Sequence, residues 1–172
     1  MSLLDSHAMD SRTPATELAL ARSLNRLLRA NGITVAVAEG GTGGRIGERL
    51  VRYAGATAYF KGSIVTYDYP SRTTVLGIPQ TLLETHGAVS EAGVRAMAEN
   101  VREKFRASLG LASTGVAGPT GNNVGGLWLA LAGAGSTAVE HHHLTPRPRI
   151  AMQAEFTRLA LRMLHTHVAR GD

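Results

Sequence analysis

Apolar residues along this chain recur at two spacings, one typical of helices and one typical of buried strands. Leucines and an alanine spaced three and four residues apart predict a helix over 14–30, started by Thr13 and Pro14. The same spacing predicts helices from the Ser90 cap to about 108 and over 147–168. We expect the last helix to face the core with Ile150, Ala154, Leu161 and Leu164.

Strands are predicted between these stripes, and the short apolar run over 33–38 lacks regular polar alternation, as expected of a strand buried on both faces. The predicted strands cover 33–38, 58–67, 109–114, 125–133 and 137–144, the last two as a hairpin. Pro70 should end the second strand, and short helices are expected at 45–51 and within 71–86. This alternation predicts an α/β fold, a three-layer α/β/α sandwich formed by one domain over 14–168, after a flexible N-terminal segment 1–13.

Composition narrows the chemistry. The 172 residues suffice for one domain with a sizeable core, and the absence of cysteine excludes disulfides, thiolate nucleophiles and cysteine-bound zinc. No apolar run reaches the roughly 18 residues of a membrane span, and the polar start lacks a signal-peptide core. We therefore expect a cytoplasmic protein with no membrane partner.

The formal charge of +5 favours an anionic partner. Nucleic-acid binding would require clustered cations with stacking aromatics, whereas the arginines are spread along predicted helices. A small anionic ligand is the better expectation.

Two glycine-rich loops follow buried strands. The first, 39–44, leads from a strand into a helix, so its N–H groups and the helix N-terminus favour phosphate or another anion. Alternatively, its glycines only let the helix lie close to the sheet. The loop matches neither the P-loop nor the dinucleotide fingerprint.

The second loop, 114–123, should lie at the same carboxyl edge, where open α/β folds place ligands. At the end of the first strand, Glu39 has either a structural role, held by loop N–H groups, or a hydrogen-bonding role in the site, and we favour the site. Thr42 either caps the helix or contacts substrate, the cap being favoured.

The run of three histidines, 141–143, raises a metal interpretation, since His141 and His143 would share a strand face. Two ligands without a third leave that site incomplete, and an exposed edge strand explains the run equally well. We expect neither a metal nor a cofactor.

Six ordered motifs nevertheless resemble one family. They are Glu39–Gly44, Phe60–Arg72, Leu76–Ile78, His86–Ser90, Thr114–Pro119 and Val124–Trp128. In the same order, the C-terminal domain of the CinA (competence/damage-inducible) family carries E-S-C-T-G-G, F-x-G-G-x-V-x-Y-S-N-x-x-K, L-G-V, H-G-A-V-S, T-G-I-A-G-P and V-G-T-V-W. The resemblance covers about 14–168.

The resemblance implies metal-free hydrolysis of the carboxamide of nicotinamide mononucleotide to the acid and ammonia. The family's motif serine would be the nucleophile, activated by a tyrosine and a lysine; these positions are Gly40, Tyr67 and Arg72 here. Glycine has no attacking atom, and a protonated arginine cannot accept a proton as lysine can. The loop after Pro119 is also shorter than usual. The resemblance therefore predicts an impaired deamidase.

Three functions follow from these features. The first is noncatalytic binding of a pyridine nucleotide or similar anionic ligand in a homo-oligomer. The second is an amidohydrolase in which Thr42, Ser63, Tyr67 or a positioned water replaces the serine, and the third is an assembly or partner-binding subunit. The expected ligand-binding residues are Glu39, Gly41, Gly43, Gly44, Thr114, Gly115 and Gly118.

Overall fold

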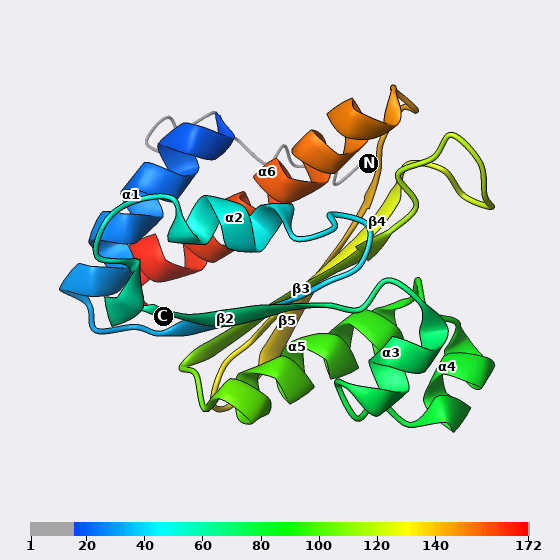
Figure 1. Ribbon diagram of the computed structural model, residues 1–172, viewed down its shortest axis with the longest axis horizontal. Helices are drawn as coiled ribbons and strands as arrows, with labels where there is room; N and C mark the ends of the chain where they lie inside the picture. Colours follow the sequence, from blue (N-terminus) through cyan, green and yellow to red (C-terminus); the bar gives the residue numbers. More distant parts are fainter. Residues whose placement is uncertain (1–15, 172) are drawn as a thin grey trace, which may run out of the picture.

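The computed structural model describes residues 16–171, which form three layers around one sheet (Figure 1). The strands are β1 (Val35–Glu39), β2 (Phe60–Val65), β3 (Leu109–Gly115), β4 (Gly126–Ala132) and β5 (Thr137–His143). The helices are α1 (Glu17–Ala30), α2 (Arg45–Val51), α3 (Tyr69–Thr74), α4 (Gln80–His86), α5 (Glu91–Phe105) and α6 (Arg149–Arg170), with a 3-10 turn η1 (Ala56–Ala58). The predicted flexible segment 1–13 lies outside the described residues.

The sheet has the strand order β2-β1-β3-β4-β5. Strands β2, β1 and β3 are parallel, whereas β4 and β5 form the predicted antiparallel hairpin. Every residue of β1 is buried, as its unbroken apolar run predicted. Because β1 and β3 are adjacent and parallel, with Glu39 opposite Ser113, the two glycine-rich loops leave the sheet at the same edge.

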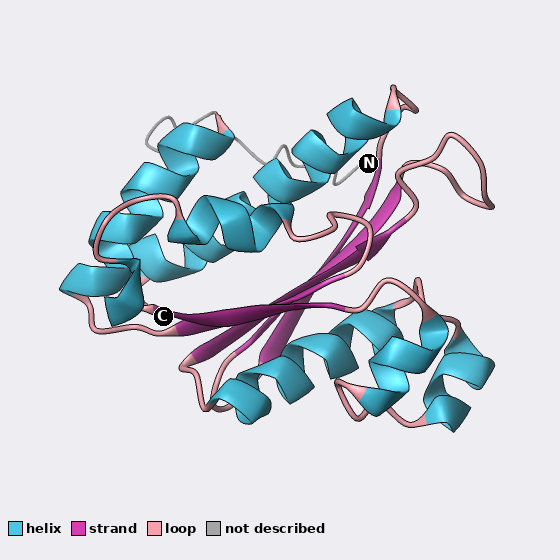
Figure 2. Ribbon diagram, viewed as in Figure 1, coloured by secondary structure: helices cyan, strands magenta, loops and turns pink. Residues whose placement is uncertain are grey.

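Helices cover both faces of this sheet, which confirms the predicted α/β/α sandwich (Figure 2). Helices α1, α2 and α6 lie on one face, and α3, α4 and α5 lie on the other. Each face has its own apolar core, the first centred on α1 and α6 and the second on α5. None of the helices described for 16–171 combines the length and hydropathy of a membrane span.

Side-chain caps explain where α5 and α1 begin. Ser90 Oγ accepts the N–H of Gly93 at 3.0 Å and starts α5, as predicted. Helix α1 begins at Glu17, three residues later than predicted, because Thr16 Oγ1 accepts the N–H of Ala19 at 3.2 Å. The predicted start signal, Thr13 and Pro14, lies outside the described residues.

Two other expectations require correction. Pro70 does not end a strand: β2 stops at Val65, and Pro70 lies in the first turn of α3, which Asp68 caps by accepting the N–H of Ser71 at 2.9 Å. In α6, Ile150 is 75% exposed, whereas Met152 is fully buried. Two residues turn the helix by about 200°, so these side chains face opposite ways.

Candidate functional site

The two glycine-rich loops meet at the carboxyl edge of β1 and β3, as predicted. The N–H of Gly40 donates to the carbonyl of Ser113 at 2.9 Å. A Cβ on Gly41 would lie 2.7 Å from the carbonyl oxygen of Gly115, so only glycine permits this close approach. The loops therefore form one continuous wall.

A pocket of about 350 Å³ opens on this wall, between α3 and the start of α6. Of the residues singled out from the sequence, it is lined by Gly40, Gly41, Tyr67, Arg72, Gly115 and Gly118. Its lining does not include Glu39, Thr42, Gly43, Gly44 or Thr114. The structure thus brings both glycine-rich loops together with Gly40, Tyr67 and Arg72, the three positions at which the resemblance implies catalytic groups.

Arg72 is the most constrained of these residues. It lies on α3 and is only 5% exposed. Its Nη1 donates to the carbonyl of Ala88, and its Nη2 donates to Thr114 Oγ1 at 3.0 Å. Burial lowers the pKa of this guanidinium, an effect partly opposed by Tyr69. Within the described part of the chain, no carboxylate forms an ion pair with it.

Gly40 lies directly against this guanidinium. A Cβ built on Gly40 would be 3.0 Å from Arg72 Nη2 and 3.3 Å from the carbonyl oxygen of Ser113. A side chain at position 40 and the present position of the guanidinium therefore compete for the same space. The two positions at which the sequence departs from its resemblance are neighbours in space.

A second arginine closes the opposite side of the pocket. Arg149, at the first position of α6, donates from Nη1 to the carbonyl of Gly118 at 2.7 Å and from Nη2 to the Tyr67 hydroxyl. Arg149 belongs to none of the motifs that the sequence singles out. Its position could have indicated a role, because a cation at a helix N-terminus interacts unfavourably with the helix dipole and is therefore unexpected there without a partner or ligand.

Two further neighbours also escaped the sequence analysis. Gln153 Nε2 donates to the carbonyl of Gly41 at 3.0 Å, and the Tyr69 hydroxyl accepts the N–H of Ala88 at 3.1 Å. Tyr69 lies within the Phe60–Arg72 motif, but the sequence assigned it no role, and Gln153 belongs to none of the six motifs. They fix the shape of the pocket wall.

Glu39 lies beneath the first loop and is fully buried. Its carboxylate accepts five hydrogen bonds of 2.8 to 3.1 Å, from Thr42 Oγ1, Ser63 Oγ and the N–H groups of Gly44, Ile46 and Gly47. Thr42 also bonds Ser113 Oγ at 2.9 Å. This geometry favours the structural alternative for Glu39 over the ligand contact that we had favoured. Together, Glu39 and Thr42 hold the loop and the start of α2.

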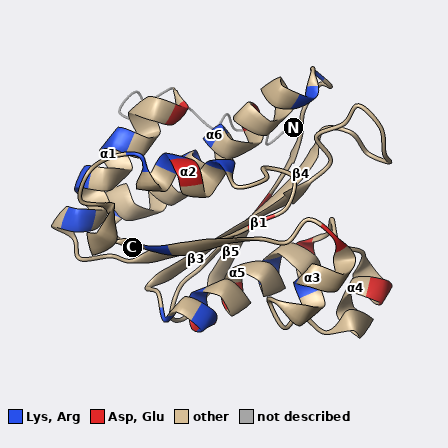
Figure 3. Ribbon diagram, in the orientation of Figure 1, with Lys and Arg blue, Asp and Glu red and all other residues tan. Residues whose placement is uncertain are grey.

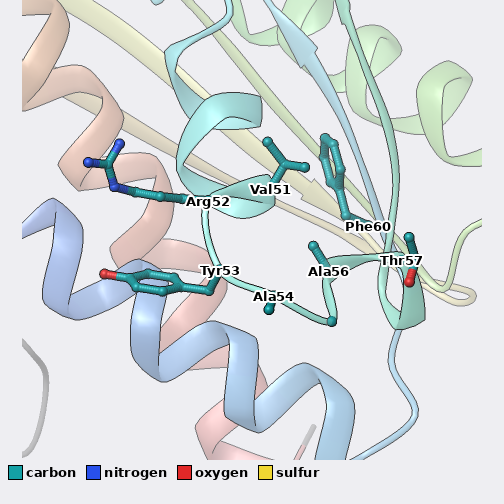
Figure 4. A pocket seen from close by; sticks show the side chains of 8 residues that line it. Val51, Arg52, Tyr53, Ala54, Ala56, Thr57 and Phe60 are labelled. Carbon is teal, nitrogen blue, oxygen red and sulfur yellow. The ribbon is translucent and has the colours of Figure 1, made fainter.

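A second pocket, of about 450 Å³, lies along residues 51–60 (Figure 4). Small and apolar side chains make up most of its lining. Its one cation, Arg52, is paired with Glu48 at 2.6 Å and points away from Val51 and Phe60 (Figure 4). This pocket presents no group suited to catalysis.

The histidine run on β5 has ordinary contacts. His141 stacks on Trp128 with ring centroids 4.1 Å apart, and His142 Nε2 lies 2.8 Å from a carboxylate oxygen of Glu140. Over residues 16–171, no group of three or more His, Asp or Glu side chains is arranged to hold a metal. Lys and Arg are spread over the helices of both outer layers rather than gathered on one surface (Figure 3).

Comparison with known proteins places these features in context. The model of the CinA C-terminal domain family matches residues 17–168. A CinA-like protein of Syntrophus aciditrophicus is 40% identical over 150 residues, covering 85% of this chain and 36% of the relative. A CinA-like protein of Gloeobacter violaceus is 41% identical, covering 92% and 38%. The chain thus spans little more than a third of these curated relatives.

Solved structures agree over almost the whole chain. The competence/damage inducible protein CihA from Agrobacterium tumefaciens superimposes with a TM-score of 0.86 at 30% identity, covering 92% of this chain and 99% of that protein. The competence damage-inducible protein A from Klebsiella pneumoniae gives 0.86 at 28% identity, covering 90% and 98%.

Proposed function

This chain belongs to the CinA C-terminal domain family, and on that premise we propose that its pocket binds a pyridine nucleotide or a similar anionic ligand without hydrolysing it. The fold, the two loops and the pocket of the family-like site are all present. The groups that would perform the chemistry are replaced at Gly40 and Arg72.

The observation that carries the proposal is a nearly buried guanidinium without an acidic partner. A buried charge is costly unless another charge or a set of hydrogen bonds compensates it. Among residues 16–171, the acceptors of Arg72 are two neutral groups, the Ala88 carbonyl and the Thr114 hydroxyl, and Arg72 lines the pocket. Arg149, on the opposite wall, also has two neutral acceptors, the Gly118 carbonyl and the Tyr67 hydroxyl. An anionic ligand would neutralise both cations.

The same geometry weighs against a substitute nucleophile. Thr42 and Ser63 donate to the Glu39 carboxylate, and neither lines the pocket. The Tyr67 hydroxyl does reach the pocket, but it accepts a hydrogen bond from Arg149, a permanent cation that cannot remove its proton. Of these three hydroxyls, only that of Tyr67 reaches the pocket, and its described hydrogen bond joins it to a cation rather than to a base.

Calorimetric titration with nicotinamide mononucleotide, combined with an ammonia assay on the same samples, tests this proposal. We expect saturable binding, weakened at least tenfold by Arg149→Gln, which removes a cation that lines the pocket, and unchanged by Arg52→Gln, a matched loss of one cation outside the pocket. Ammonia should not exceed the buffer blank. Turnover near 1 per second, an ordinary enzymatic rate, would contradict the proposal, as would the absence of binding.

A further inference from the structure

The guanidinium of Arg72 has donors to spare and lacks a negative partner. Arginine carries five N–H donors and no acceptor. Among the described residues, the Ala88 carbonyl and Thr114 Oγ1 accept two of them. The remaining N–H groups belong to a side chain that lines the pocket. A ligand group placed there must be a hydrogen-bond acceptor, and its hydrogen bond to the guanidinium is strongest if the group is negatively charged.

The missing side chain at Gly40 leaves room beside this guanidinium. The space that a Cβ would fill lies 3.0 Å from Arg72 Nη2, 3.3 Å from the carbonyl oxygen of Ser113, which accepts the N–H of Gly40, and 3.6 Å from Thr114 Oγ1. Gly40 and Gly41 present only backbone atoms to the pocket, so a flat group can lie against them. Arg72 thus supplies this part of the pocket with a positive charge and with its remaining hydrogen-bond donors.

One acid also lines the pocket, and it limits how an anion can be oriented. Asp68 caps α3, and its hydrogen bonds from Ser71 lower the pKa of its carboxyl group. Asp68 thus carries a negative charge at neutral pH. An anionic group of a ligand is therefore less favourable beside Asp68 than beside Arg72 or Arg149.

We propose that Gly40 and Arg72 form a carboxylate subsite, so that the pocket prefers the acid form of its ligand to the corresponding carboxamide. This inference rests on the proposed function and adds the ligand's chemical class. A carboxylate offers two acceptor oxygens to the guanidinium, whereas a carboxamide offers one and turns its NH₂ donors towards other donors. The amide also leaves the buried cation without a counter-ion.

The two departures from the family motif then have one common consequence. A side chain at position 40 would crowd Nη2 and fill the subsite. Glycine at 40 and arginine at 72 therefore act together as determinants of ligand specificity. They exchange an amide-cleaving arrangement for one that holds an acid.

Nicotinic acid mononucleotide and nicotinamide mononucleotide differ only in the group in question and are suitable probes. Titration of the full chain by calorimetry at pH 7.5 should give a dissociation constant at least tenfold lower for the acid, as expected for a hydrogen bond between charged groups. Arg72→Gln should weaken binding of the acid at least tenfold and change binding of the amide less than about threefold. Arg52→Gln, the control, should leave both unchanged.

Each result decides the question. Equal affinity for acid and amide in the unmodified chain would overturn the subsite and leave the proposed function standing, whereas binding of neither would overturn both. A preference for the acid that survives in Arg72→Gln would overturn the assignment to Arg72. If that variant does not fold, Gly40→Ala replaces it. Its Cβ crowds Nη2, so the acid-to-amide affinity ratio should fall, and an unchanged ratio would overturn the subsite.

Discussion

Gly40 and Arg72 should be energetically coupled, because they share the same space. Gly40→Ala places a Cβ 3.0 Å from Arg72 Nη2 and 3.3 Å from the Ser113 carbonyl oxygen, both closer than ordinary van der Waals contact. Overpacking of this kind costs about 1–3 kcal/mol. Because Gly40 does not have a positive φ, alanine fits its backbone and recovers about 0.4–1 kcal/mol from the unfolded state. The net expectation is a loss of roughly 0.5–2 kcal/mol.

Arg72→Lys removes one terminal nitrogen and with it the close contact, although it also loses a hydrogen bond to the Ala88 carbonyl or to Thr114. The double variant Gly40→Ala with Arg72→Lys should therefore be more stable than the sum of the single changes predicts. We expect a coupling of about 1–2 kcal/mol, within the range measured for residues in contact.

Urea unfolding of the four proteins, followed by circular dichroism, measures this coupling directly. The four free energies of unfolding form a double-mutant cycle that gives the coupling energy between positions 40 and 72, provided that the denaturant dependence is the same in all four proteins. Additivity within about 0.5 kcal/mol would refute the shared-space argument. A Gly40→Ala variant as stable as the unmodified protein would do so as well.

Three other predictions concern the catalytic positions 40 and 72, the buried carboxylate of Glu39 and the buried imidazole of His165. The double variant Gly40→Ser with Arg72→Lys should regain detectable ammonia release from nicotinamide mononucleotide. Either change alone should not, because nucleophile and base act as a unit. A Gly40→Ser single variant as active as the double variant would show that position 72 is not the base. Glu39→Gln should lower the free energy of unfolding by roughly 2–4 kcal/mol in urea titrations, because an amide nitrogen would face N–H donors of the loop. The control is Glu84→Gln, at an exposed carboxylate, and a loss of stability no larger than in that variant would contradict the prediction. Burial lowers the pKa of His165, whose Nδ1 has no hydrogen-bond partner within the described residues, so the unfolded chain takes up the proton first. The stabilising contribution of neutral His165 should be complete above about pH 6.5 and should fall as pH drops through the folded-state pKa. Thermal midpoints between pH 5 and 8 measure this dependence, and His165→Gln should flatten it.

The layered fold was predictable because its signals are local. Apolar periodicity, the Ser90 cap and the unbroken run of β1 each act within a few residues, and together they require a sheet covered on both faces. The shared edge of the two loops also followed, since the carboxyl ends of neighbouring parallel strands meet. Element ends were less accurate where a second cap, such as Thr16, competes with the first.

The electrostatics of the site were not predictable in the same way. The sequence showed a missing serine and a missing lysine as two separate losses, whereas the structure places Gly40 and Arg72 in contact. The role of Glu39 depends on which N–H groups surround it, and this is a property of the folded loop. Arg149 reaches the pocket from the last helix, too far along the chain for any motif to include it.

One measurement tests binding, its location and the absence of hydrolysis together. Nitrogen-15 NMR of the protein with saturating nicotinamide mononucleotide, recorded repeatedly over a day, follows both the backbone amides and the proton signals of the ligand. We predict shifts of the amide signals of Gly40, Gly41, Gly115 and Gly118, with the carboxamide of the ligand unchanged throughout. Conversion of the ligand to its acid, or shifts confined to the pocket along 51–60, would contradict the account.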